Sequence, residues 1–202
     1  MKKAVVYVHG KGGRAEEAEH YKPLFQSYDV VGFDYRSETP WEAVGEFPRL
    51  FDPLAQKYDA VILIANSIGA YFAMQSLSGR NVERAFLISP IVDMEKLILQ
   101  MLSWAGADER ELRERGEIPT AFGETLSWEY LSYVRSHPIR WAVPTEILYG
   151  ERDNLTDQTT ISEFAARIHA GLTVMPGGEH WFHTGEQMAF LDAWLMRDLS
   201  KT

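Results

Sequence analysis

The chain has 202 residues and a formal net charge of −9, with 46% hydrophobic and 24% charged residues. This length and composition predict one soluble globular domain, residues 1–202, with a sizeable core. The excess of acidic residues argues against a nucleic-acid partner, because a phosphate-binding surface needs clustered Lys and Arg. The lack of cysteine excludes disulfides, thiolate metal ligands and a cysteine nucleophile.

The N-terminal apolar run is too short for a signal peptide. Residues 4–8 lead directly into His9-Gly10, and no cleavage-site pattern follows. No run in the chain approaches the roughly 18 apolar residues of a membrane span. We therefore expect a cytoplasmic protein that does not bind membranes.

Six short apolar runs rich in β-branched residues are predicted to form strands. They cover residues 4–8, 30–33, 60–65, 84–88, 146–149 and 172–175. Each run is nearly continuous rather than alternating, which is typical of strands that are covered on both faces.

Longer segments between these runs carry apolar residues at helical spacing. The predicted helices cover residues 42–57, 68–77, 161–169 and 187–199. Strands that alternate with helices predict an α/β fold whose sheet is mainly parallel, with about six strands and helices on both faces.

One connection is much longer than the others. More than 50 residues separate the strand near Ile88 from the strand near Ile147, and they contain helical patterns at 94–104, 108–117 and 127–136. Because this exceeds an ordinary connection, we expect a helical insertion at about 91–142 that forms a short lid.

A serine follows the third predicted strand in the stretch Ala65-Asn66-Ser67-Ile68-Gly69. A serine nucleophile can be exposed on a sharp turn between a strand and a helix, and the residues two before and two after it must then be small. Ala65 replaces the usual glycine of this G-x-S-x-G pattern but is still small. The alternative interpretation is that Ser67 only caps the following helix.

Three further motifs follow other predicted strands. His9-Gly10 and a glycine-rich loop follow the first strand, Gly150-x-x-Asp153 follows the fifth, and Gly177-Gly178-Glu179-His180 follows the sixth. Catalytic groups of open α/β sheets gather at the carboxyl ends of the strands. A serine, a carboxylate and an imidazole are therefore predicted to meet there.

With these motifs in this order, the chain resembles the α/β-hydrolases over essentially its full length. The resemblance implies a Ser67–His180–Asp153 triad and an oxyanion hole made by the backbone N–H groups of Ile68 and Lys11. It implies a serine hydrolase of the carboxylesterase or thioesterase type that acts on a small-molecule acyl substrate through an acyl-enzyme and needs no cofactor.

Other residues compete for the roles of acid and base. Asp93 follows the fourth strand, and some family members take their acid from that region. Asp157 is placed to cap a helix, and Asp34 ends the second strand. His183 is spaced i, i+3 from His180, but no third ligand suggests a metal site, so we expect none.

Aromatic residues of the insertion and of the last loop are candidates for an apolar substrate pocket. The predicted pocket residues are Trp104, Trp128 and Trp181. The alternative for the insertion is a small core of its own.

Two other functions stay open. The spacing of Gly10, Gly12 and Ala15, with Asp34 after the next strand, matches a dinucleotide-binding fingerprint. The chain can also be a noncatalytic binding protein with a hydrolase-like fold. Oligomeric state and substrate identity do not follow from the sequence.

Overall fold

The computed structural model describes residues 2–199, and these form two compact units. The first contains the chain up to Val92 and from Arg140 onward, and the second contains Asp93–Ile139. The second unit lies within the predicted insertion at about 91–142.

A parallel sheet forms the centre of the first unit. Its order is β2-β1-β3-β4-β7-β8, and every neighbouring pair is parallel. The strands are β1 (Lys3–Val8), β2 (Asp29–Gly32), β3 (Ala60–Asn66), β4 (Arg84–Ile88), β7 (Thr145–Gly150) and β8 (Gly171–Met175). The predicted fold class and all six predicted strands are confirmed.

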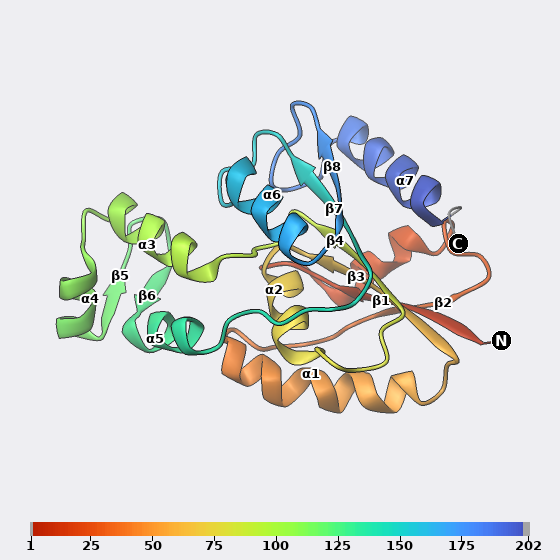
Figure 1. Ribbon diagram of the computed structural model, residues 1–202, viewed down its shortest axis with the longest axis horizontal. Helices are drawn as coiled ribbons and strands as arrows, with labels where there is room; N and C mark the ends of the chain where they lie inside the picture. The colour runs from red at the N-terminus through yellow and green to blue at the C-terminus, as the bar shows by residue number, and fades with distance from the viewer. Residues whose placement is uncertain (1, 200–202) are drawn as a thin grey trace. The chain divides into compact units, whose positions relative to one another are not determined.

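Helices cover both faces of this sheet. The helices are α1 (Pro40–Ala55), α2 (Ser67–Ser76), α6 (Gln158–Arg167) and α7 (Gly185–Leu199), and a 3₁₀-helix η1 (Ala15–Tyr21) follows β1. Figure 1 shows α6 and α7 on opposite sides of β7 and β8. The four predicted helices are confirmed, whereas η1 was not predicted.

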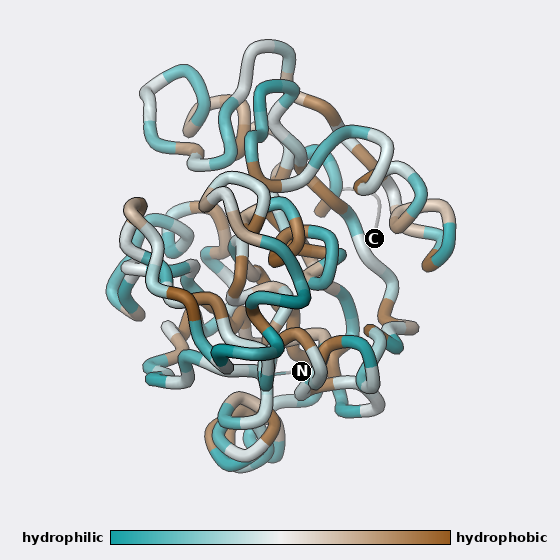
Figure 2. The backbone as a smooth tube through the Cα atoms, turned by 90° about the vertical axis from the view of Figure 1, so that its left-hand side faces the viewer, coloured by the Kyte–Doolittle hydropathy of each residue, from teal (hydrophilic) through white to brown (hydrophobic). Residues whose placement is uncertain are grey.

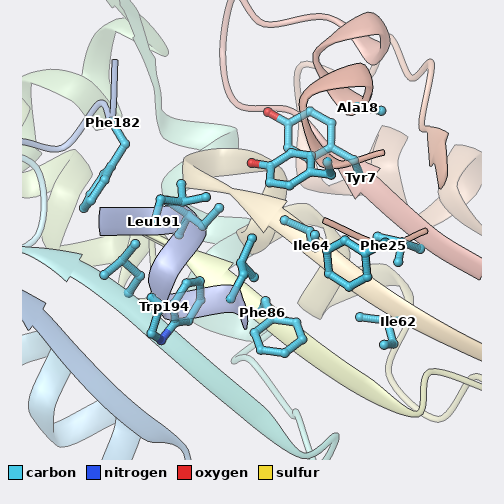
Figure 3. Close-up of a cluster of buried hydrophobic side chains, with 14 of the residues drawn as sticks. Tyr7, Ala18, Phe25, Ile62, Ile64, Phe86, Phe182, Leu191 and Trp194 are labelled. Atoms are coloured by element: carbon cyan, nitrogen blue, oxygen red, sulfur yellow. The ribbon is translucent and has the colours of Figure 1, made fainter. Parts of the chain in front are cut away.

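The core between the sheet, η1 and α7 is apolar and closely packed. Phe86 of β4 meets Trp194 of α7 edge to face, with ring centroids 5.5 Å apart (Figure 3). Tyr7 of β1 packs against Tyr21 of η1, with ring centroids 5.1 Å apart. Figure 2 shows that the hydrophobic stretches of the backbone are short and are separated by longer hydrophilic ones. This pattern is expected when buried residues come from strands and from single faces of helices.

Helix α1 begins two residues earlier than predicted because of its cap. The Thr39 side chain accepts a hydrogen bond from the Glu42 N–H, while the Glu42 carboxylate accepts one from the Thr39 N–H. Pro40 occupies the first helical position, where its missing N–H costs nothing.

The second unit contains helices and a small antiparallel sheet. Its elements are α3 (Met94–Trp104), α4 (Glu109–Arg115), β5 (Glu117–Pro119), β6 (Thr125–Ser127) and α5 (Trp128–Ser136). The three helices were predicted, but the strands β5 and β6 were not. Across residues 2–199, no helix has both the length and the apolar character needed to cross a membrane.

Candidate active site

The site lies at the carboxyl edge of the parallel sheet. β1 ends directly before His9, β3 directly before Ser67, β7 at Gly150 and β8 at Met175. Because these strands run in the same direction, the segments that follow them emerge on the same side of the sheet. The topology therefore gathers the four predicted motifs at one edge.

Ser67 sits in a strained turn between β3 and α2. Its φ is 51°, in the left-handed region that non-glycine residues rarely adopt. The backbone N–H of Ile91, which follows β4, donates to the Ser67 carbonyl oxygen at 3.2 Å and so helps to hold this conformation. Strain of this kind is typical of functional turns.

Two glycines make room for this turn. A Cβ on Gly69 would lie 2.0 Å from the His9 carbonyl oxygen, so only glycine lets α2 approach the segment after β1. A Cβ on Gly10 would lie 3.2 Å from the Ser67 Cβ. The two backbones are therefore in direct contact beside Ser67, which explains the small residues of the motif.

Ser67, His180 and Asp153 form a continuous hydrogen-bonded chain. The Ser67 Oγ lies 2.8 Å from the His180 Nε2, and the His180 Nδ1 lies 2.7 Å from the Asp153 Oδ2. The Asp153 side chain is 0% exposed, and the His180 side chain is 14% exposed. The structure thus brings together all three residues predicted for the triad, two of them from segments more than 80 residues beyond Ser67 in the chain.

The Asp153 carboxylate is fixed by its own turn. Its Oδ1 accepts from the backbone N–H groups of Leu155 at 2.8 Å and Thr156 at 3.1 Å, which leaves Oδ2 for His180. The Arg152 N–H donates to the Gly178 carbonyl at 2.7 Å, which joins the acid turn to the loop that carries His180. The orientation of both side chains is therefore set by backbone contacts.

The competing carboxylates have other partners or are exposed. Asp157 caps α6 by accepting from the Thr160 N–H at 2.9 Å, as expected. Asp93 caps α3 by accepting from the Lys96 N–H at 2.9 Å. Asp34 is exposed after β2.

The alternative base, His183, is engaged elsewhere. Its Nδ1 lies 2.7 Å from the Trp181 carbonyl oxygen and 3.8 Å from the Glu179 carboxylate. Its ring stacks on Trp181 with centroids 4.3 Å apart. Within residues 2–199, no group of three His, Asp or Glu residues is arranged to hold a metal ion.

Of the two residues predicted to donate to an oxyanion, Lys11 follows Gly10, which packs against Ser67, and Ile68 is next to Ser67 in the chain. Ile68 follows it in the first turn of α2, where backbone N–H groups have no acceptor within the helix. Lys11 is the second residue of a turn closed by a 3.1 Å hydrogen bond from the Gly13 N–H to the Gly10 carbonyl. Gly12, with a φ of 73°, supplies the conformation that this turn needs.

The glycine-rich loop at residues 10–13 is also the segment that suggested nucleotide binding. A dinucleotide fingerprint places the pyrophosphate at the start of an α-helix. Here the glycine-rich loop leads into the seven-residue 3₁₀-helix η1, and Gly10 packs against Ser67. The glycines of the loop are therefore explained without a nucleotide.

Tyr35 is part of the site's support and was not predicted. Its hydroxyl donates to the His9 carbonyl oxygen at 2.8 Å, and its ring stacks on His9 with centroids 4.3 Å apart. His9 therefore packs against Tyr35 beside the loop rather than at the His180 position. No pattern in the sequence links positions 9 and 35.

The predicted pocket residues lie in different parts of the chain. Trp181 belongs to the first unit and is 67% exposed beside His180. Trp104 and Trp128 belong to the second unit, where Trp104 meets Phe122 edge to face and Trp128 lies against Arg113. A substrate-binding role for the three stays a prediction.

Comparison with known proteins places this site in a family. Residues 5–193 match the family described as the alpha/beta hydrolase family. A search of the curated proteins gives no match.

Solved structures share the fold at low sequence identity. Alpha/beta hydrolase domain-containing protein 10 from mouse is 15% identical with a TM-score of 0.78, and the match covers 98% of this chain and 90% of that one. Est1E from Butyrivibrio proteoclasticus is 16% identical with a TM-score of 0.73, covering 99% and 87%. An alpha-beta serine hydrolase homologue from Coxiella burnetii is 15% identical with a TM-score of 0.62, covering 98% and 85%.

Proposed function

The chain belongs to the alpha/beta hydrolase family, and from this premise we propose that it is a serine hydrolase that cleaves a carboxylic ester or a related acyl substrate. The hydrogen-bonded chain of Ser67, His180 and buried Asp153 is the observation that carries this proposal. A capping serine needs no imidazole, and an ordinary buried carboxylate needs no histidine that reaches on to a serine.

The contacts assign the protons of the triad. An ionised Asp153 can only accept, so His180 donates its Nδ1–H to Oδ2. The His180 Nε2 is then free of a proton and accepts from the Ser67 hydroxyl. This tautomer is the one that a general base next to a nucleophile requires.

The reaction follows in two halves. Ser67 Oγ attacks the acyl carbon as its proton moves to His180 Nε2, and the backbone N–H groups of Ile68 and Lys11 stabilise the oxyanion. His180 then gives this proton to the leaving alcohol or thiol. A water molecule, deprotonated by His180, attacks the acyl-enzyme, and the acid product leaves with Ser67 reprotonated.

The nature of the acyl group is the open part of this proposal. One of the proteins with a similar fold, Est1E, has been solved with ferulic acid bound. We therefore include aromatic as well as aliphatic acyl esters and thioesters in a first substrate screen. Trp181, exposed and next to His180 in the chain, is our candidate for an apolar contact with that group.

Steady-state kinetics on this panel tests the proposal. We expect Ser67→Ala to lower kcat by about 10³-fold or more while the circular dichroism spectrum and melting temperature stay those of the wild type. Unchanged turnover in Ser67→Ala rejects the nucleophile. A wild type that turns over no member of the panel and does not react with an active-site serine probe favours a noncatalytic binding protein.

The choice of acid is tested by a matched pair of variants. We expect Asp153→Asn to lower kcat by about 10³ to 10⁴-fold, because the amide favours the wrong tautomer of His180. Asp93→Asn, which changes a helix cap, leaves kcat near the wild-type value. If instead Asp93→Asn lowers kcat strongly and Asp153→Asn does not, the acid of the triad is Asp93.

A further inference from the structure

A pair of hydrogen bonds joins the buried Tyr7 to the loop that carries Lys11 through the exposed residue Glu17. The Tyr7 side chain, from β1, is 2% exposed, and its hydroxyl donates to the Glu17 Oε2 at 2.6 Å. The Asn66 side chain lowers the pKa of the same Tyr7 hydroxyl, against the larger effects of burial and of Tyr21 and Glu17. Tyr7 pairs with Ile64 in the parallel ladder of β1 and β3, and β3 ends directly before Ser67, so one end of this chain lies on the strand next to the nucleophile turn.

The other end of the chain is attached to the loop. The second oxygen of the Glu17 carboxylate, Oε1, accepts from the Arg14 N–H at 3.0 Å, and Arg14 closes the loop that begins at Gly10. A Cβ on Gly13 would lie 2.9 Å from this oxygen and 2.9 Å from the His9 Cβ. Glycine at position 13 therefore lets the loop rest directly on the carboxylate.

The electrostatics keep this chain in one arrangement. Burial raises the pKa of Tyr7, and the neighbouring Tyr21 and Glu17 raise it further. The hydroxyl therefore stays protonated through neutral and mildly alkaline pH and continues to donate to Glu17. A short hydrogen bond from a buried hydroxyl to a carboxylate is among the stronger hydrogen bonds in proteins.

We propose that Glu17 is a positioning residue of the active site, which sets the place of the Lys11 N–H relative to Ser67. Through Arg14 it holds the loop, and through Tyr7 it is joined to β1, the strand that pairs with the strand leading to Ser67. The inference rests on the proposed function, because it assigns a purpose to an oxyanion loop. Neither Glu17 nor Tyr7 touches the substrate; both act through the backbone of the loop.

A purely structural role makes a different prediction. Glu17 lies in the first turn of η1, and a carboxylate there stabilises the turn by itself. In that case its removal lowers the melting temperature and leaves the chemistry unchanged. Positioning instead predicts a loss of transition-state stabilisation that exceeds any change in substrate affinity.

The experiment compares Glu17→Ala and Tyr7→Phe with the control Glu16→Ala. Glu16 is the adjacent residue of the same helix, so the control removes the same charge next to the network. Loss of a whole oxyanion donor costs about 10² to 10³-fold in kcat, so we expect a displaced donor to cost on the order of 10-fold. KM stays within about twofold, and Glu17→Gln, whose amide oxygen can still accept from Arg14, recovers part of kcat.

A second readout separates positioning from stability. An alkylboronic acid forms a tetrahedral adduct with the Ser67 Oγ and so samples the oxyanion hole without turnover. We expect its inhibition constant to rise in Glu17→Ala and Tyr7→Phe by the same factor by which kcat falls. The double variant is expected to lose no more than the worse single variant, because both changes break one chain.

Three outcomes overturn the inference. Equal kcat and boronic acid affinity in Glu17→Ala and Glu16→Ala, with a wild type that is active, reject positioning and leave the proposed function intact. A loss confined to melting temperature also rejects it. A wild type with no turnover and no reactive Ser67 removes the proposed function and this inference together.

Discussion

The conformation of single residues decides whether Ser67 can act as a nucleophile. Its left-handed φ costs a non-glycine residue on the order of 1–2 kcal/mol, and the structure keeps it by packing two backbones together. Gly69 and Gly10 provide this contact, because larger side chains there meet the His9 carbonyl and the Ser67 Cβ. The glycines of the motif therefore serve the turn rather than the chemistry.

Gly69→Ala tests this account of the turn. The added methyl group would lie 2.0 Å from a backbone oxygen, so the helix α2 or the segment after β1 must shift. We expect a loss of unfolding free energy of about 1–3 kcal/mol and a loss of activity larger than the loss of stability explains. Urea unfolding and kcat on one ester measure the two effects.

Gly185→Ala is the matched control for this variant. A Cβ at Gly185 meets no atom within 4 Å at the start of α7. We expect its unfolding free energy to stay within about 0.5 kcal/mol of the wild type. Equal effects of the two substitutions contradict the close approach at Gly69.

At the residue scale, the sequence predicted the three residues of the hydrogen-bonded chain but not the contacts that support them. Ser67, Asp153 and His180 each follow a strand closely, so sheet topology alone brings them together. Tyr35 and Glu17 act through contacts with residues 26 and 10 positions away in the chain, and no periodicity marks such contacts. Backbone donors to Asp153 likewise depend on a turn that only the structure defines.

Among the elements, the helices of the second unit are tied together by one arginine. Arg135 of α5 donates to Glu95 of α3 at 2.7 Å and to Glu109 of α4 at 2.6 and 2.8 Å. The hydrogen bond from Arg135 holds the pKa of Glu109 below its ordinary value. The pairing with Glu109 and Glu95 in turn raises the pKa of Arg135.

Arg135→Ala is expected to loosen this unit selectively. Amide hydrogen exchange in Asp93–Ile139 should become faster, while exchange in the central sheet stays unchanged. The control is Arg110→Ala, because the Arg110 side chain lies 4.0 Å from Glu114 on an exposed face of α4. Unchanged exchange in Arg135→Ala, or an equal effect of Arg110→Ala, contradicts the bridging role.

The pH dependence of this pairing has a definite sign. A carboxyl group with a lowered pKa in the folded state adds stability above its unfolded pKa, and this stability is lost as the pH falls through the folded pKa. Protection of the second unit in the wild type should therefore fall at acid pH, below about 4.3. Arg135→Ala should show a smaller fall over the same range.

The elements that were missed are the short ones. Runs of three residues, such as β5 and β6, carry too little pattern to be recognised, and η1 shows neither strand nor helix periodicity. Each helix of the insertion has a capping residue, and α3 and α5 also carry apolar residues at helical spacing, whereas α4 is a charged segment with Leu112 as its buried residue. Long periodic elements are thus readable from the sequence, whereas short ones depend on their neighbours in space.

For the whole molecule, several buried tyrosines predict that the folded state loses stability at alkaline pH. Burial, with Asp153 and Asp157 nearby, raises the pKa of Tyr149 to about 12, and its hydroxyl donates to the Thr156 carbonyl at 2.9 Å. Burial also raises the pKa of Tyr7, Tyr21 and Tyr35. The folded state therefore disfavours every one of these phenolates.

The raised pKa values of these tyrosines determine how stability changes with pH. Stability from these hydroxyls is fully present below the unfolded pKa of about 10 and is lost as the pH rises through about 12. We expect the free energy of unfolding in urea to fall over this range and Tyr149→Phe to fall less steeply. A flat profile, or identical slopes for the two proteins, contradicts the assignment.

Labelling with a fluorophosphonate probe, followed by peptide mass spectrometry, shows whether Ser67 is an activated nucleophile. We expect one adduct, on Ser67, that is lost on denaturation and in His180→Ala. No adduct on a folded wild-type protein, or an adduct on Ser67 that persists in His180→Ala at the same rate, would contradict it.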